Sequence, residues 1–111
     1  MNELLFLSVL FEYYGNLLTE RQYEICDMYL NQNLSLGEIS AHLQISRQGV
    51  RDALIKAENL LKNFEDKLRI QQKNLRLSGL VEDIQKLSYE ISDKELASKI
   101  VSITEEISDL I

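Results

Sequence analysis

The feature that most constrains this chain is its lack of proline together with its scarcity of glycine. Its 111 residues include no proline and only four glycines. A β-sandwich or barrel of this length must reverse its strands many times, and those turns draw heavily on both residue types. The sequence therefore excludes that class and favours an all-α fold. The hydrophobic fraction of 45% and the charged fraction of 27% are those of a globular chain with room for one domain.

The small numbers of cysteine and histidine residues exclude several functions. Its single cysteine, Cys26, cannot form an internal disulfide, and with one histidine, His42, the usual zinc ligand sets cannot be assembled. No nucleophile or carboxylate is placed to form a catalytic set with His42. We therefore expect no enzyme activity, no metal and no cofactor, and the reducing cytoplasm as the compartment.

The apolar run at residues 4–11 is too short to span a membrane and has no basic residue before it, so it lacks the features of a signal peptide. It predicts a core helix and no membrane insertion. The net charge of −6 also argues against bulk attraction to nucleic acid or anionic lipid. The charge is uneven: residues 62–79 carry five basic and two acidic side chains, whereas residues 80–111 carry three and eight.

Serine and threonine residues mark where helices are expected to begin. Capping boxes, in which a hydroxyl residue stands three before Glu or Gln, occur at Thr19, Ser35 and Ser92. Ser46 opens a fourth helix with an incomplete box, because the third residue after it is Gly49. These signals predict helices at about 20–31 and 36–43, one beginning at Ser46, and one following Ser92.

The spacing of apolar residues predicts how far the later helices run. One long stripe, ending before Gln71, indicates a helix over residues 46–68; it consists of Val50, Leu54, Ala57, Leu61, Phe64 and Leu68. Two shorter stripes follow Gly79 and Ser92, at Leu80, Ile84, Leu87 and Ile91 and at Leu96, Ile100, Ile103, Ile107 and Leu110. The expected linkers are Gly15-Asn16, residues 31–34 and Ser78-Gly79. Short amphipathic helices are marginal alone, so these two must fold back or pair with a second copy.

A helix-turn-helix motif is predicted over residues 36–54. A short helix at 36–43, a tight turn at Gln44-Ile45 and a helix opened by Ser46 have its geometry. Leu36, Ile39 and Leu43 would then face Val50 and Leu54, with Ile45 in the corner. Arg reads guanine and Gln reads adenine in the major groove, and Ser and Lys hold phosphates. The candidate DNA-binding residues are Ser46, Arg47, Gln48, Arg51, Ile55 and Lys56.

Two capped helices with a tight turn also occur in ordinary helical bundles, and Asp52 beside Arg51 repels phosphate. An alternative is therefore an interaction module that does not bind DNA and that contacts RNA or protein through a basic stretch. The residues of this basic stretch are Lys62, Lys67, Arg69, Lys73 and Arg76.

The order of these elements resembles the YlxM family of small bacterial proteins, whose helix-turn-helix is like region 4 of sigma factors. The resemblance covers roughly residues 4–70 and rests on residues 10–22, Ser35-Leu-Gly-Glu-Ile, Ile45-Ser-Arg-Gln-Gly-Val-Arg-Asp and residues 58–68. The family's Ser-Arg-Gln corresponds to Ser46, Arg47 and Gln48. This sequence departs from the family pattern at Gly49, where alanine is more usual, and at Arg51, where tyrosine is common. The resemblance implies a DNA-binding regulatory protein of the signal recognition particle pathway.

Together these patterns divide the chain into a helix-turn-helix domain at residues 1–70 and a helical tail at 71–111. The tail either belongs to the same structural unit or serves for dimerisation. The expected partners are double-stranded DNA and a second copy of the chain, because a homodimer would present two recognition helices about 34 Å apart. Components of the signal recognition particle are the partners in the alternative hypothesis.

Overall fold

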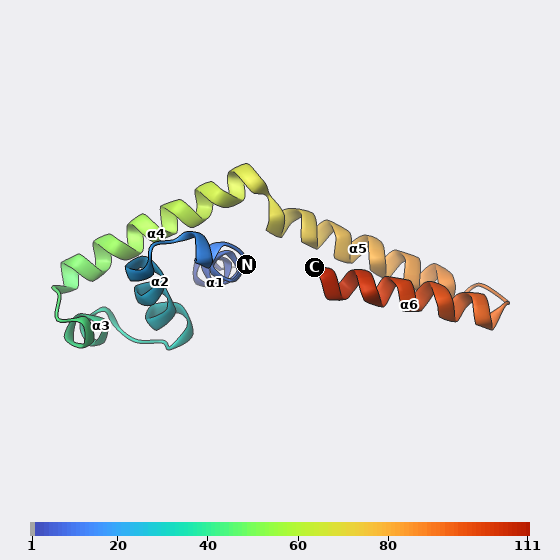
Figure 1. Ribbon diagram of the computed structural model, residues 1–111, viewed down its shortest axis with the longest axis horizontal. Helices are drawn as coiled ribbons and strands as arrows, with labels where there is room; N and C mark the ends of the chain where they lie inside the picture. Colours follow the sequence, from blue (N-terminus) through green and yellow to red (C-terminus); the bar gives the residue numbers. More distant parts are fainter. Residues whose placement is uncertain (1) are drawn as a thin grey trace. The chain divides into compact units, whose positions relative to one another are not determined.

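The computed structural model describes residues 2–111, and over that range it contains six α-helices and no strand (Figure 1). The predicted all-α fold is confirmed. The chain divides into two compact units, a first that ends at Gln71 and a second that spans Gln72–Ile111. Each unit is described separately below.

The first unit contains four α-helices: α1 (Glu3–Tyr14), α2 (Glu20–Cys26), α3 (Leu36–Leu43) and α4 (Arg47–Leu68). The capping boxes predicted at Thr19 and Ser35 are both present, each with its two reciprocal hydrogen bonds. The helix expected at 20–31 has the predicted extent, but its second half is a π-helical turn at Asp27–Asn31. A short 3-10 turn at Gly15–Leu17 stands at the first predicted linker.

Helix α4 is the element on which the first unit is assembled, since α1, α2 and α3 all pack against it (Figure 1). Its predicted stripe faces inward: Val50, Ala57 and Leu61 are almost wholly buried. Around Ala57 and Leu61 lies one apolar cluster, with buried side chains from α1 and α2. Around Val50 lies a second, with Ile39 from α3. The helix predicted at the apolar N-terminal run is confirmed as a core element, because Leu10, Phe11 and Tyr14 in its second half are buried.

The end of α4 is fixed by a contact with α1. Arg69 adopts a left-handed conformation with φ of 55° and ψ of 32°. The Tyr14 hydroxyl donates to Glu65 Oε1 at 2.6 Å and accepts from the Ile70 amide at 3.0 Å, and the same Glu65 oxygen accepts from the Gln71 amide at 3.1 Å. These bonds satisfy amides at the start of the next helix that would otherwise lack partners. Burial and the neighbouring Glu65 raise the pKa of Tyr14.

The second unit is a hairpin of two antiparallel helices, formed by most of α5 (Ile70–Ser88) and by α6 (Lys94–Leu110) (Figure 1). The linker predicted at Ser78-Gly79 is wrong, because α5 runs through both residues. One glycine costs a helix only about 1 kcal/mol, which the flanking turns and the packing of α6 offset. The cap predicted at Ser92 is also wrong: Asp93 caps α6, accepting from the amides of Glu95 and Leu96. A carboxylate is as good a cap as a hydroxyl, so the sequence offered two adjacent candidates.

Candidate nucleic-acid interface

The turn between α3 and α4 is tight and is held by Ser40. Gln44 ends α3 in a left-handed conformation, with φ of 57° and ψ of 43°. Both the Gln44 and the Ile45 amides donate to the Ser40 carbonyl, and the Ser40 hydroxyl donates to the Ile45 carbonyl at 2.5 Å. A left-handed residue other than glycine costs roughly 1–2 kcal/mol. The three bonds to Ser40 fix this turn in spite of that cost.

An apolar corner holds the two helices in a fixed relation. Ile39 and Val50 are completely buried where α3 meets α4. The remaining apolar residues predicted to line this contact are partly buried against them; they are Leu36, Leu43, Ile45 and Leu54. Each fully buried aliphatic side chain contributes roughly 1.5–3 kcal/mol. The corner therefore orients the first turns of α4 as a helix-turn-helix requires, and the predicted motif is confirmed.

The first two turns of α4 bring most of the candidate DNA-binding residues onto one exposed face. Arg47, Gln48, Arg51 and Ile55 all point outward from this part of α4. We call these four residues the recognition face. Ser46 precedes them, and its hydroxyl oxygen accepts from the Gly49 amide at 2.9 Å, which makes it the cap of α4.

Lys56 does not belong to the recognition face. It lies about 100° around the helix from Ile55. There it lines a separate, open hollow between α2 and α4 together with Gln22, Asn59, Leu60 and Asn63. The amide side chains of this hollow were not singled out from the sequence, because nothing in their spacing distinguishes them from an ordinary solvated helix surface.

Two members of the recognition face are positioned by neighbouring side chains. The Gln48 side-chain amide donates to Asp52 Oδ1 at 2.8 Å, so the acidic residue next to Arg51 is engaged within the helix. The Arg47 guanidinium lies over Gly37 in the first turn of α3, where a Cβ atom would stand 3.2 Å from its Nε. Gly37 therefore allows Arg47 to approach α3. The sequence signal for this contact was a glycine inside a helix, where it lowers helix propensity.

Acidic and apolar groups border the recognition face on its other side. Arg51 and Ile55 line a shallow hollow together with Tyr29, Leu36 and Glu58. The Glu58 carboxylate is partly buried and is bound by Lys62. The interface thus has two arginines at its start and a carboxylate towards its end, which restricts the anion-binding part to the first two turns of α4.

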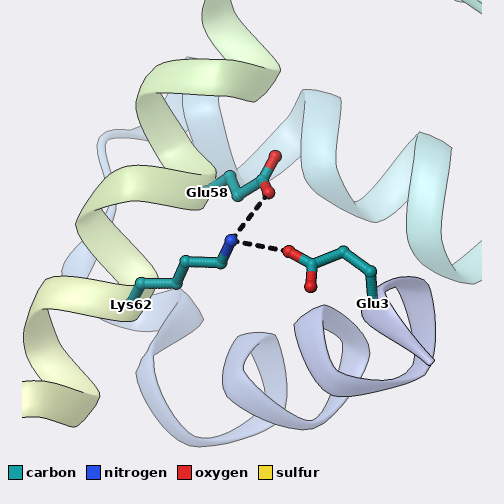
Figure 2. A network of polar contacts seen from close by, with 3 residues as sticks. All are labelled: Glu3, Glu58 and Lys62. Atoms are coloured by element: carbon teal, nitrogen blue, oxygen red, sulfur yellow. Dashed lines mark hydrogen bonds and ion pairs between the residues drawn. The ribbon is translucent and has the colours of Figure 1, made fainter. Parts of the chain in front are cut away.

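The basic stretch of residues 62–76 is divided between the two units, and its first member is already held by acidic side chains. Lys62 is held by two carboxylates, since its Nζ lies 2.6 Å from Glu3 Oε1 and 3.1 Å from Glu58 Oε1 (Figure 2). These two carboxylates raise the pKa of Lys62, and the ammonium group lowers the pKa of Glu3. Lys67 and Arg69 are exposed at the end of α4, whereas Lys73 and Arg76 are exposed in the second unit.

Neither a metal-binding cluster nor a membrane-spanning helix is found among the described residues. Across residues 2–111 no three His, Cys, Asp or Glu side chains come close enough to hold a metal ion. Within the same range, none of the helices combines the length and the apolar character needed to span a bilayer. Cys26 is buried in the core of the first unit, and burial raises the pKa of its thiol to about 11.

These features define the class of the protein: it is a helix-turn-helix protein whose second helix exposes arginine and glutamine at its start. The chain belongs to the YlxM / p13-like family of helix-turn-helix proteins, whose family model matches residues 1–103. The family expected from the sequence is therefore confirmed.

Three relatives, each named UPF0122 protein, illustrate how much of the chain is shared. The protein from Thermoanaerobacter sp. strain X514 is 41% identical over 107 residues, which cover 96% of this chain and 92% of the relative. The Acetivibrio thermocellus protein is 41% identical over 108 residues, covering 90% and 92%. The Clostridium kluyveri protein is 40% identical over 104 residues, covering 90% and 93%. The similarity therefore includes the second unit as well as the helix-turn-helix.

Proposed function

We propose that this protein is a DNA-binding regulatory protein that inserts the start of α4 into a major groove. The observation that carries the proposal is the recognition face itself: Arg47, Gln48 and Arg51 stand exposed on the first two turns of a helix that the α3 corner holds rigidly. Arginine and glutamine are the side chains that read guanine and adenine bidentately. Ser46 at the cap and Lys56 at the margin would contact phosphates.

The proposal includes three further points that follow from the sequence analysis. The protein acts as a homodimer, which would place two recognition faces one helical turn of DNA apart, about 34 Å. It works in the cytoplasm within the signal recognition particle pathway, as the family resemblance implies. It carries out no catalysis and needs no cofactor.

A second function is favoured by the electrostatics. Glu58 borders the recognition face, Asp52 is beside Arg51, and the chain has a net charge of −6. These features weaken attraction to a duplex. In the alternative, the groove-reading residues are unused and the protein binds RNA or a protein of the signal recognition particle. The basic residues exposed for this purpose are Lys67, Arg69, Lys73 and Arg76; Lys62, already held by two carboxylates, would contribute least.

Fluorescence anisotropy distinguishes the two functions. Labelled random-sequence duplex DNA and labelled signal recognition particle RNA are each titrated with protein at two salt concentrations. DNA affinity should fall by about 0.9 log unit per log unit of salt for each phosphate contact. We expect Arg47→Ala and Arg51→Ala each to weaken binding to this duplex severalfold and to lower its salt dependence by about one phosphate contact, since each removes one cationic side chain from the interface.

Arg21→Ala is the matched control, because Arg21 is an exposed arginine on α2, outside the recognition face. It should leave duplex binding within about twofold of the wild type. If Arg21→Ala weakens binding as much as Arg51→Ala does, the contact is nonspecific. If the wild type binds no duplex at low salt but binds RNA, and Lys67→Ala with Arg69→Ala weakens that RNA binding, the alternative function replaces the first.

A further inference from the structure

The hairpin of the second unit has its polar and apolar residues in an unusual arrangement. Where α5 meets α6, the buried residues are Val81, Ser88 and Thr104. The contact includes a hydrogen bond, in which the Gln85 side-chain amide donates to Thr104 Oγ1 at 2.9 Å. Ile100, Val101 and Ile107 are partly buried. Several other large aliphatic side chains of the hairpin remain exposed, among them Leu87 at 63%, Ile103 at 58% and Leu110 at 85%.

These aliphatic residues recur at intervals of three and four, as the core residues of a coiled coil do. We call the two runs the apolar seams. The seam of α5 consists of Leu77, Leu80, Ile84, Leu87 and Ile91, and that of α6 of Leu96, Ile100, Ile103, Ile107 and Leu110. Ile91 follows the last turn of α5 and continues the spacing. Such a repeat keeps one side of a helix apolar along its whole length, so it indicates packing against another helix.

Both seams lie on the same side of the hairpin. On each helix the seam is about 90° around the axis from the residues that contact the other helix, and in the same rotational sense. Because α5 and α6 run antiparallel, the same sense on each helix turns both seams to one side (Figure 1). The hairpin therefore has one apolar face made of two parallel rows.

The exposed apolar area of this face is large enough to supply most of the apolar part of a homodimer interface. Seven of its side chains are each 40–85% exposed; they are Leu77, Leu80, Ile84, Leu87, Leu96, Ile103 and Leu110. Together they equal about four wholly exposed side chains, or on the order of 400 Å² of apolar surface, since burial of one contributes ~1.5–3 kcal/mol at ~25 cal/mol per Å². A stable interface buries about 800 Å² per partner, of which about 65% is apolar in homodimers.

The small size of the second unit also favours a dimer interface on this face. It spans only residues 72–111. Units of about 40 residues rarely bury enough surface to be stable alone, and they rely on disulfides, metals or oligomerisation. The chain's single cysteine is Cys26, in the first unit, and the described residues form no metal cluster. Of these three means, oligomerisation is the one left to stabilise the hairpin.

We propose that the apolar face is covered by the same face of a second copy, so that two α5–α6 hairpins form an antiparallel four-helix bundle. A two-fold axis relates the two hairpins, so both copies contribute the same seam residues to the interface, as a self-complementary dimer interface requires. The seams then supply the core positions of a four-helix bundle, with helices crossing at about 20°. This inference names the surface behind the homodimer in the proposed function, and it does not depend on DNA binding.

Sedimentation equilibrium of the full chain without nucleic acid tests the proposal. The wild type should have twice the 12.9 kDa mass of the chain. Leu87→Glu should sediment as a monomer, because it places a charge among the apolar core residues of the bundle. Leu75→Glu is the matched control: Leu75 is also on α5 and also 63% exposed, but it lies outside the seam. It should remain a dimer.

Milder variants keep the test decisive if a glutamate disturbs the hairpin. Leu80→Ala and Ile103→Ala should each raise the dimer dissociation constant by about 30-fold or more, the effect of losing a central interface residue. Protection of Cys26 from alkylation reports whether the first unit remains folded in each variant. A monomeric wild type would overturn the proposal and would mean that the first unit or another protein covers the face. Equal behaviour of Leu87→Glu and Leu75→Glu would overturn it as well.

The proposal of a dimer and the proposal of DNA binding can be contradicted independently of each other. If Arg51→Ala abolishes duplex binding while the wild type is a monomer, the bundle is wrong and the recognition face stands. If the wild type is a dimer whose dissociation needs Leu87→Glu, and it binds no duplex, the bundle stands and DNA binding is wrong.

Discussion

The two units carry the same kind of amphipathic helix but bury it differently. In the first unit, the stripe of α4 is covered by three other helices of the chain, and Val50, Ala57 and Leu61 are at most 1% exposed. In the second unit, the comparable residues Leu87 and Ile103 remain more than half exposed. Apolar periodicity therefore establishes that a helix forms and which side it buries. It does not establish whether the covering surface belongs to the same chain.

The largest difference in the free energy of unfolding is expected between two leucine-to-alanine substitutions, one in each unit. Leu61→Ala should lower the free energy of unfolding by about 2–5 kcal/mol, because it leaves a cavity beside α1 and α2. Leu75→Ala, at an exposed position of α5, should change it by less than about 0.5 kcal/mol. Urea unfolding followed by circular dichroism measures both changes, because the helices of both units contribute to the signal. Cys26 alkylation reports the first unit separately, since the buried thiol, with its pKa raised to about 11, reacts only when that unit opens. Equal losses would show that the first unit is not the better packed of the two.

Removing the Tyr14 hydroxyl should have the next largest effect. Tyr14→Phe deletes the bonds to Glu65 and to the Ile70 amide, and it should lower the free energy of unfolding by about 1–3 kcal/mol because two part-buried hydrogen bonds, one of them to a carboxylate, are lost. Tyr23→Phe is the control, as the Tyr23 ring packs on Phe11 and is 40% exposed. A Tyr14→Phe protein as stable as Tyr23→Phe would contradict the assignment of the α4–α5 break to this contact.

The left-handed residue in the turn provides a stabilising test. Gln44→Gly should raise the free energy of unfolding by roughly 1 kcal/mol, because glycine adopts this conformation without the Cβ penalty. The same change at Gln48, inside α4, should lower it by about 1 kcal/mol. Chemical denaturation of the two variants checks the pair. Loss of stability in Gln44→Gly would mean that the Gln44 side chain itself holds the turn.

The smallest effect concerns the ion pairs of Lys62, which join α1 to α4. The ammonium group lowers the pKa of Glu3 in the folded protein, so the pair stabilises the first unit above the unfolded pKa of about 4.5 and is lost as the pH falls through the lowered value. Lys62→Met should therefore flatten the dependence of stability on pH below neutrality, and NMR titration of the Glu3 carboxyl should show its pKa rising. An unchanged Glu3 titration in Lys62→Met would show that the pair does not form in solution.

Whether a feature of the fold could be predicted from the sequence depends on how far apart in the sequence the interacting residues lie. Local signals placed the caps at Thr19, Ser35 and Ser46 correctly, and the apolar stripe placed the end of the long helix at Leu68. The left-handed Arg69 and the contact of Tyr14 with the Ile70 amide had no local signal, because neither glycine nor proline is present there and Tyr14 lies 55 residues from Arg69 in the sequence. The linker expected at Gly79 failed for the opposite reason, since a local signal was present and the helix continues through it.

The candidate interface shows the same difference between local interactions, which the sequence predicts, and contacts between distant residues, which it does not. The positions of Arg47, Gln48, Arg51 and Ile55 on one face followed from helical spacing alone. The support of Arg47 by Gly37 and the capture of Lys62 by Glu3 required knowledge of which helices meet. A run of charge in the sequence does not reveal its partners, as the ion pairs of Lys62 with Glu3 and Glu58 show; the role of the basic stretch stays a prediction.

The most direct test of the account is to map where nucleic acid touches the protein. Amide signals of the ¹⁵N-labelled chain are followed by NMR while unlabelled duplex DNA is added. The account predicts that the largest shifts fall on residues 46–55, with little change in the hairpin of residues 72–111. Shifts confined to Lys67, Arg69, Lys73 and Arg76, or no saturable shifts with duplex, would contradict the proposal that this helix-turn-helix reads DNA.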